Sequence, residues 1–358
     1  AHFPVYLNLG AGEPLESETA AEIITSAHGG SVLVYTDSPM GRLGFIDIAD
    51  PADPQPAGFF ALGGEPTSVA VVDDLALVGV NTSESFTDPS GHLAVVDISD
   101  VAAPVLVTEI DLGGQPDSVA TSPDGRFAAI AIENERDEDA CAAGDGTLID
   151  AAFDDEDACI AAGGIFGGLP QLPAGYLSIV SLNGDPSGWS ATEVALTGLA
   201  AESPSDPEPE YVAINDNNQA VVSLQENNHL VIVDLAGASV NSHFAGGAVS
   251  LTEVDAVEND LIDPVYSIDG LVREPDAVTW LDASTIVTAN EGDWKGGSRG
   301  VTSFALDGSV LLDSGEALEY AGIAAGHYPE LRAENKGVEP EGVLAARYGP
   351  ATYLFTGA

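Results

Sequence analysis

The sequence is poor in positive charge. Nine residues are Lys or Arg and 58 are Asp or Glu, which gives a formal net charge of −49 over 358 residues. A surface this acidic repels nucleic acid and anionic lipid, so we expect neither as a general partner. Solubility in a salty environment, where ions screen the repulsion, explains most of the acidic residues. A small, clustered subset could instead bind a hard cation such as Ca²⁺.

Long apolar segments are also absent. No stretch approaches the roughly 18 to 20 apolar residues of a membrane-spanning helix, so we expect no membrane insertion. The chain begins at "AHFPVYLNLG", which has neither the basic segment nor the apolar run of a signal peptide; such a peptide could already have been removed. Apolar residues still make up 45% of the chain, which is enough for a substantial core.

The chain has only two cysteines, Cys141 and Cys159, within the acidic stretch "ACAAGDGTLIDAAFDDEDAC". Free or metal-bound thiols are the alternative to a disulfide, but the stretch lacks the spaced Cys and His residues of a zinc site. A disulfide would close a small loop and contribute about 3 kcal/mol in the chain-entropy model. We therefore predict a disulfide and a secreted, extracellular or cell-surface location.

Several catalytic motifs are missing. The sequence contains no G-x-S-x-G elbow, no H-E-x-x-H pair, no Walker-type phosphate loop and no G-x-G-x-x-G fingerprint. The sequence therefore lacks the usual motifs of serine hydrolysis at a nucleophile elbow, of zinc proteolysis and of nucleotide-cofactor chemistry. If the protein is an enzyme, metal-assisted hydrolysis is the natural class.

What the sequence does contain is a repeat of Glu or Gln, then Pro, then two residues, then Val. It occurs as "EPTSV" (65–69), "QPDSV" (115–119), "EPEYV" (208–212), "EPDAV" (274–278) and "EPEGV" (339–343). Each copy begins a strand-like run, and further short apolar runs follow it. Groups of four short strands at intervals of about 50 to 65 residues are typical of a β-propeller. The predicted fold is all-β, a propeller of about six to seven four-stranded blades.

The repeats predict one β-propeller domain over residues 1–358. The longest gap between repeats holds an acidic, cysteine-containing segment, residues 135–174, which we interpret as a loop insertion on one blade. The last unit ends at "ATYLFTGA" after two strands, so the last blade or blades are expected to be incomplete in this chain. The N-terminal "FPVYLNL", a further part of the native protein or a partner segment could complete it.

The acidic residues of the repeat are candidate metal ligands. The first strand of each propeller blade lines the central channel, so residues just before these strands converge on the axis. Converging carboxylates repel one another unless a cation neutralises them, and Ca²⁺ binds six to eight oxygens. Alternatively, each acid accepts hydrogen bonds from turn N–H groups of its own blade. The candidates in this first ring are Glu208, Glu210, Glu274, Asp276, Glu339 and Glu341.

A second ring is expected where the second strands end. Its candidate metal ligands are Glu133, Glu226 and Glu291. Asn residues lie beside them, and ordinary turn chemistry also explains these asparagines. Six of the nine basic residues lie in or beside these motifs, where they either form salt bridges or create a positive spot for an anion. The six are Arg136, Arg273, Lys295, Arg299, Arg332 and Lys336. His327 is a candidate for proton transfer, although a lone histidine in a loop is more often a surface residue.

Longer motifs resemble a family of secreted bacterial propellers. They are "IENERDED", "LPQLPAGYLSIVSLNGDPSGW", "EPEYVAINDNNQAVVSLQENN", "REPDAV", "TANEGDWKGGSRG" and "GHYPELR…KGVEPEG". The chain resembles the choice-of-anchor I proteins, which carry alkaline-phosphatase-like or phytase-esterase-like labels, and it is similar to mesenchyme-specific cell-surface glycoproteins. The resemblance implies a secreted propeller carried on larger surface proteins. The cysteine-containing stretch and the stop after "YLFTGA" depart from the family pattern.

Two functions follow as hypotheses. One is a calcium-dependent, alkaline-phosphatase-like phosphoesterase acting on a small phosphorylated substrate, in which Arg273, Lys295 and Arg299 bind phosphate. The other is a non-catalytic extracellular propeller for surface attachment, matrix or filament building, completed by another segment or chain or by self-association.

Overall fold

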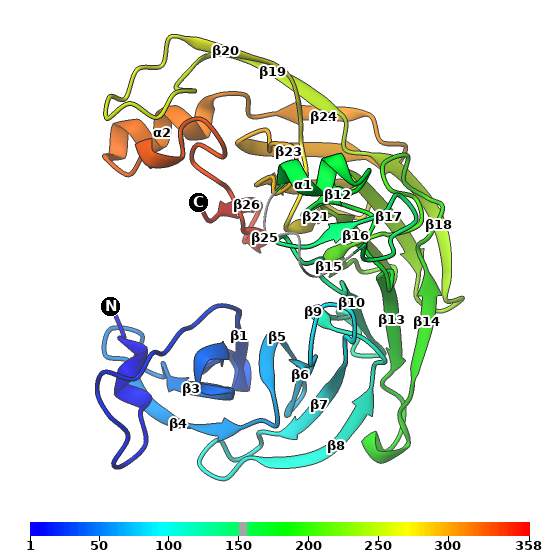
Figure 1. The fold of residues 1–358 in the computed structure, drawn as a ribbon. Coiled ribbons are helices and arrows are strands. Elements are labelled where there is room, and N and C mark those ends of the chain that lie inside the picture. Colours follow the sequence, from blue (N-terminus) through cyan, green and yellow to red (C-terminus); the bar gives the residue numbers. More distant parts are fainter. Residues whose placement is uncertain (150–155) are drawn as a thin grey trace. The chain divides into compact units, whose positions relative to one another are not determined.

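The computed structural model describes residues 1–149 and 156–358. Contacts group the chain into two compact units, the first made of residues 1–135 and 177–193 and the second of residues 136–176 and 194–358. Figure 1 labels most of the strands and the two α-helices. The cysteine-containing segment belongs to the second unit, apart from its first residue. In the sequence, however, it lies between two strands of one sheet of the first unit.

The first unit has three four-stranded sheets, two made of strands consecutive in sequence and a third from which the cysteine-containing segment is left out. The two middle strands of each sheet are mostly buried, and the last strand of each is largely exposed. The sheets are β1 (Ile24–Ala27) to β4 (Gln55–Ala61) with β2 (Val32–Asp37) and β3 (Arg42–Asp47) between them; β5 (Glu65–Val72), β6 (Leu75–Asn81), β7 (Gly91–Asp97) and β8 (Val105–Asp111); and β9 (Pro116–Thr121), β10 (Phe127–Ile132), β13 (Tyr176–Ser181) and β14 (Ala191–Ala195).

The second unit has two four-stranded antiparallel sheets, three hairpin pairs and two α-helices among its described residues. The sheets are β15 (Pro209–Ile214), β16 (Gln219–Leu224), β17 (His229–Asp234) and β18 (Ser239–Ala245); and β21 (Val278–Asp282), β22 (Thr285–Asn290), β23 (Gly300–Ala305) and β24 (Val310–Asp313). The pairs are β11 (Cys141–Ala142) with β12 (Ile165–Phe166), β19 (Ala248–Val254) with β20 (Tyr266–Val272), and β25 (Val343–Tyr348) with β26 (Ala351–Thr356); the helices are α1 (Glu156–Ala161) and α2 (Ala317–Ala325).

Successive sheets pack through their first strands. In the first unit β5 contacts β1 and β9, and in the second β21 contacts β15 and β25. Between the two sheets of the second unit lies a core that includes Val221, Ile232, Val278 and Phe304. Sheet-on-sheet packing of this kind defines propeller blades, because a single four-stranded sheet cannot bury both of its faces alone.

The repeat has the structural role that the sequence predicted. Its valine is buried in every copy, with exposures of 3% for Val69, 7% for Val119, 2% for Val212, 1% for Val278 and 6% for Val343. The all-β propeller fold with four-stranded blades is therefore confirmed. The last repeat contributes only the pair β25 and β26. Closure of the ring and its organisation as a single domain stay predictions.

The predicted disulfide is also confirmed. Cys141 in β11 is bonded to Cys159 in α1 across a sequence separation of 18, and both side chains are buried. The bond packs against Gly164, where an added Cβ would lie 2.4 Å from the Cys141 sulfur. None of the helices within the described residues is long and apolar enough to cross a membrane.

Candidate functional site

The site is built around a glycine-rich loop between β22 and β23, residues 291–299. Only glycine fits two of its positions, because a Cβ at Gly292 would lie 1.5 Å from the Gly296 oxygen and one at Gly297 would lie 1.8 Å from the Glu291 oxygen. The buried carboxylate of Glu274 accepts hydrogen bonds from the N–H groups of Asp293 (3.0 Å) and Lys295 (2.8 Å). Glu274 therefore shapes the loop, as the turn-binding alternative predicted.

Burial raises the pKa of Glu274, while the N–H groups of the loop lower it. The carboxylate thus replaces its lost water with the loop's own donors. The same Glu274 has a positive φ of 41° and donates its backbone N–H to the side chain of Asn228 at 3.1 Å. Asn227 accepts from the N–H of Glu208 at 3.0 Å in an equivalent way. The asparagines of the second ring thus hold the residues that precede the prolines.

Arg136 is the centre of a buried charge cluster. Its guanidinium lies 2.9 Å from Glu226 and 3.3 Å from Glu208, and it also contacts Asp293 and, at 3.2 Å, Glu138. The Arg136 side chain is 5% exposed, and those of Glu208 and Glu226 are 0% and 3% exposed. Burial acts to lower the pKa of Arg136, but the carboxylates of Glu226, Glu208 and Asp293 raise it above the ordinary value. We call these five residues the Arg136 cluster.

Burial within this cluster is not fully compensated. Burial raises the pKa of Glu226 to about 7, although Arg136 acts against the shift. The Glu226 Oε2 atom is buried and has no hydrogen-bond partner within residues 1–149 and 156–358. Burial likewise raises the pKa of Asp206, two residues before Glu208, to about 7. Arg136 carries one positive charge and contacts two buried carboxylates, Glu208 and Glu226, so it cannot neutralise both.

Lys336 is the centre of a second cluster. Its Nζ atom lies 3.0 Å from Glu291, 3.3 Å from Glu339 and 3.6 Å from Asp293. Burial acts to lower the pKa of Lys336, but Glu291 and Asp293 raise it above the ordinary value. Asp293 belongs to both clusters, so it connects Lys336 to Arg136. We call Lys336, Glu291, Asp293 and Glu339 the Lys336 cluster.

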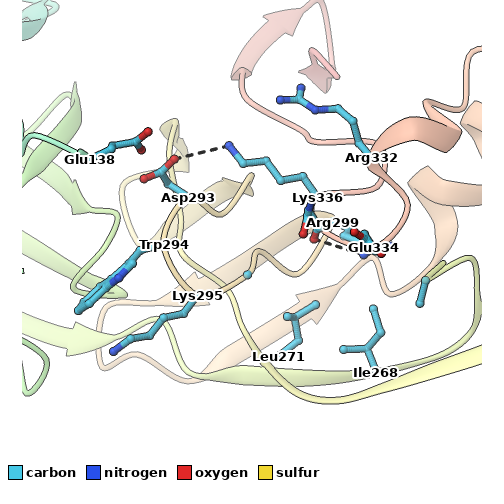
Figure 2. Close-up of a pocket in the computed structure, with 13 residues that line it drawn as sticks. Glu138, Ile268, Leu271, Asp293, Trp294, Lys295, Arg299, Arg332, Glu334 and Lys336 are labelled. Atoms are coloured by element: carbon cyan, nitrogen blue, oxygen red, sulfur yellow. Dashed lines mark hydrogen bonds and ion pairs between the residues drawn. The ribbon is translucent and has the colours of Figure 1, made fainter. Parts of the chain in front are cut away.

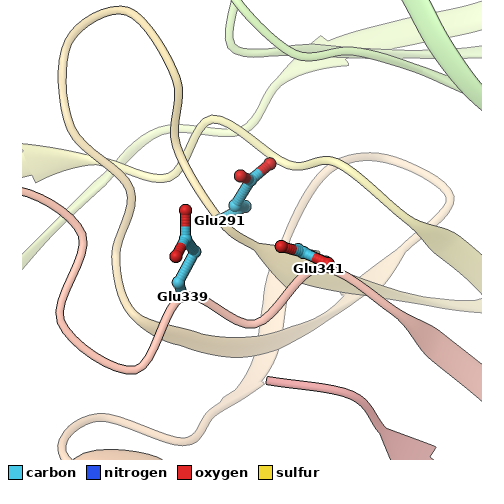
Figure 3. Close-up of side chains that lie close together, drawn as sticks. All are labelled: Glu291, Glu339 and Glu341. Carbon is cyan, nitrogen blue, oxygen red and sulfur yellow. The ribbon is translucent and has the colours of Figure 1, made fainter. Parts of the chain in front are cut away.

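Three carboxylates of the predicted rings lie together beside Lys336. Oxygens of Glu291, Glu339 and Glu341 are all within 4.8 Å of one another, and Figure 3 shows the three side chains side by side. Glu291 follows β22, while the other two precede β25. Glu291 is also held by Gln225, whose Nε2 donates to it at 2.9 Å, and Glu339 also contacts Arg332. We call Glu291, Glu339 and Glu341 the carboxylate triad.

A cavity of about 730 Å³ lies next to the Lys336 cluster. Figure 2 shows Glu138, Asp293, Lys336, Arg332 and Glu334 around it, with the side chain of Lys336 reaching Asp293. Trp294, Leu271 and Ile268 supply apolar surface, and Lys295 lies over the Trp294 ring at 3.9 Å from the ring centroid. The two basic side chains can bind an anion, and the apolar surface can bind a ring or chain of the same ligand.

Two predicted phosphate-binding residues have other partners. The buried guanidinium of Arg273 binds Asp313 at 2.8 Å and the Gly246 carbonyl at 2.9 Å. Arg299 is 1% exposed and donates to the carbonyls of Asp255 (2.8 Å) and Ala333 (2.7 Å). Both stabilise the fold, although Arg299 also borders the cavity. Sequence alone could not show this, because a basic residue beside an acidic motif can face either the core or the solvent.

The remaining predicted residues are spread over the fold. Lys295 borders the cavity, half-exposed, and pairs with Glu202 at 2.6 Å. His327 is exposed at the end of α2, where its N–H donates to Gly322 at 2.9 Å. Glu210 lies in β15, Asp276 precedes β21, and Glu133 follows β10 in the first unit, where its N–H donates to Gln115 at 3.0 Å. None of these three belongs to the carboxylate triad.

Glu208, Glu274 and Glu339 nevertheless meet through one loop, because Asp293 links the Arg136 and Lys336 clusters and Glu274 holds its N–H group. Sequence reasoning did not single out Asp293 as the link, nor Glu138 and Trp294 as cavity residues. The clustering of the scarce basic residues at the acidic motifs was the one available signal.

The model of the choice-of-anchor I domain matches residues 22–296, well over half of the chain. The chain belongs to the choice-of-anchor I domain family. The match covers the Glu274 and Asp293 region of the site but not the segment that carries Lys336, Glu339 and Glu341. The family part of the sequence-based resemblance is thus confirmed, while its phosphatase and glycoprotein labels stay predictions.

Solved structures resemble this choice-of-anchor I chain only distantly. They include a nidogen/laminin complex (TM-score 0.44, 10% identity, 82% of this chain and 80% of that chain). They also include a putative 6-phosphogluconolactonase from Bacteroides uniformis (0.46, 10%, 82% and 70%) and a Lactobacillus plantarum protein (0.49, 11%, 82% and 70%). At this level of similarity they bear on neither ligand nor activity. A search of the curated proteins found no match.

The Arg136 cluster generates a stability prediction. Replacing Arg136 by Met removes the charge that compensates buried Glu208 and Glu226, so we expect a loss of about 3–5 kcal/mol in the free energy of unfolding. Arg126→Met is the matched control, because Arg126 forms an exposed pair with Asp124 at 2.7 Å and should cost less than about 1 kcal/mol. Urea denaturation measures both, and equal losses would contradict the role assigned to Arg136.

Proposed function

We propose that this chain is an extracellular binding domain whose carboxylate triad holds a divalent cation, Ca²⁺, next to Lys336 and Arg332. In this proposal the cation and the two basic side chains bind the phosphate group of a small phosphorylated ligand. The observation that carries the proposal is the position of Lys336, which contacts the carboxylates on one side and borders the cavity on the other. The disulfide and the choice-of-anchor I domain support a secreted or surface location.

The triad fits Ca²⁺ in chemistry and spacing. Calcium prefers carboxylate oxygens at about 2.3–2.6 Å, so two ligands on opposite sides of the ion lie about 5 Å apart. The triad oxygens, all within 4.8 Å of one another, meet that limit. If each carboxylate binds through one oxygen, the triad supplies three of the six to eight oxygens that calcium takes, and water or a ligand phosphate would complete the shell.

Lys336 acts as an internal competitor for the cation. Its ammonium group lies 3.0 Å from Glu291 and 3.3 Å from Glu339, so it neutralises two of the three triad carboxylates. A divalent cation must therefore bind on the side of exposed Glu341 or displace the ammonium group. We infer weak to moderate calcium affinity that rises when Lys336 is removed, because the triad then carries its full negative charge.

Phosphoester hydrolysis is the second candidate, and the placement of two basic side chains next to the triad favours it. A bound metal would polarise a phosphoryl oxygen and lower the pKa of its water. Arg332 and Lys336 would stabilise negative charge that develops on the phosphoryl group. Arg273 and Arg299 already bind structural partners, so we assign phosphate binding to Arg332 and Lys336 instead.

Surface or matrix assembly is favoured by a separate observation. The pair β25 and β26 exposes Leu344 (59%), Tyr353 (52%) and Phe355 (50%), and Tyr348 packs edge-on against both aromatic rings. An apolar sheet face of this kind is available to another segment or chain. Binding at the cavity is compatible with this role.

Calcium titration tests the metal part of the proposal. In isothermal titration calorimetry we expect Glu341→Gln to weaken Ca²⁺ binding about tenfold, because a liganding charge is lost, and Lys336→Met to strengthen it. Glu258→Gln, an exposed glutamate outside the triad, is the control. No calcium binding by the wild-type protein, or equal affinity in all four proteins, would remove the triad as a metal site.

Hydrolysis is tested with bis-p-nitrophenyl phosphate and p-nitrophenyl phosphate at alkaline pH. If the chain is a phosphoesterase, turnover requires Ca²⁺, stops with EDTA and falls at least about tenfold in Arg332→Met, because stabilising charge is lost. Phosphate binding without any metal-dependent turnover would leave a binding domain and eliminate the enzyme. Wild-type protein incubated with EDTA and then with excess Ca²⁺ controls for irreversible unfolding.

A further inference from the structure

The disulfide-bonded insertion contributes one wall of the cavity. Glu138, three residues before Cys141, borders the cavity directly. Gly168 packs against the Trp294 ring so closely that an added Cβ would lie 2.7 Å from the ring carbon Cζ2. The insertion therefore contacts the cavity both by a charged side chain and by its backbone.

A continuous set of contacts connects the disulfide to this wall. Cys141 belongs to β11, which pairs with β12, and β12 leads directly into Gly167 and Gly168. Gly167 has a φ of 61°, its N–H donates to the Ala140 carbonyl at 2.9 Å, and a Cβ there would lie 2.3 Å from the Glu138 carbonyl oxygen. The side chain of Gln171 bonds both backbone groups of Asp137, at 2.8 and 3.0 Å. The backbone next to Glu138 is thus held on both sides.

The charge of Glu138 on this wall is opposite to that of Lys336 and Arg332, which also border the cavity. The Glu138 side chain is 67% exposed and 3.2 Å from Arg136, which also contacts Glu208, Glu226 and Asp293. Lys336 and Arg332 border the cavity, as Figure 2 shows, together with Glu334 of the same segment. The cavity therefore borders basic side chains that attract an anion and, at Glu138, an exposed carboxylate that repels it.

We propose that this wall is the specificity element of the site: Glu138 excludes a second anionic group, so that the cavity accepts a ligand with one phosphate and discriminates against a ligand with two. The claim rests on the proposed phosphate-binding function for the identity of the ligand. The exclusion of anions by Glu138 does not depend on that function and can be measured without any ligand.

The ligand-free measurement uses ¹⁹F NMR of protein labelled with 5-fluorotryptophan. The chain has three tryptophans, and Trp294→Phe identifies the Trp294 resonance while leaving the labelled protein otherwise intact. Paramagnetic relaxation of this resonance is measured with an anionic and with a neutral gadolinium chelate. Glu138→Gln should increase relaxation by the anionic chelate about twofold to threefold and leave relaxation by the neutral chelate unchanged, because only charge is removed. Glu258→Gln should change neither.

The disulfide is tested in the same way. In the double variant Cys141→Ser, Cys159→Ser, both chelates should gain access to Trp294, because the wall is no longer held. Unchanged relaxation by both chelates in a variant with a native circular dichroism spectrum would contradict the connection between the disulfide and the cavity. Unchanged relaxation in Glu138→Gln would overturn the proposal itself.

The ligand measurement compares glucose 6-phosphate with glucose 1,6-bisphosphate by calorimetry in the presence of Ca²⁺. We expect the wild-type protein to prefer the monophosphate and Glu138→Gln to reduce that preference about threefold to fivefold, since one nearby like charge is removed. An unchanged ratio rejects Glu138 as the specificity residue while the proposed function stands. If neither sugar phosphate binds but the NMR result is as expected, the proposed function is rejected and the exclusion of anions by Glu138 is retained.

Discussion

The second unit depends on neutralising carboxylates that its fold removes from water. The chain has 58 acidic and only nine basic residues, so basic partners for buried acids are scarce. Arg136 and Lys336 each serve several carboxylates, and Asp293 is shared by both. Taking a carboxylate out of water costs several kcal/mol unless a charge or a set of hydrogen bonds compensates it. The positions of these two basic residues therefore constrain every segment that carries one of the acids.

The same constraint explains why the site is where it is. The loop that carries Asp293 is compact because glycine occupies its closest contacts and because Glu274 binds its N–H groups. That compactness brings Asp293 to both clusters and leaves Trp294 and Lys295 on the cavity surface. Structural charge pairs and a ligand-binding surface are thus neighbours on one loop. A ligand that alters the charge near Lys336 would act directly on the pairing that holds the loop.

Sequence reasoning succeeded where the signal was local. The valine of each repeat marked a buried strand position, and the spacing of the repeats predicted four-stranded blades correctly. Glu208, Glu274 and Glu339 are connected through the loop that carries Asp293, and their role as metal ligands stays a prediction. Sequence reasoning could not show which basic residue meets which acid, because Arg136 and Asp293 are 157 positions apart. Arg273 and Arg299 show the same limit, since their partners are carbonyls and carboxylates whose proximity only tertiary packing determines.

The most direct test of the central claim is a double-mutant cycle on stability with Arg136→Met and Glu226→Gln. If Arg136 is retained because it compensates buried carboxylates, removing the Glu226 charge should restore part of the stability that Arg136→Met loses, with a coupling free energy of about 2–3 kcal/mol. Additive effects, within about 0.5 kcal/mol, would mean that Arg136 contributes mainly by packing and would contradict the account.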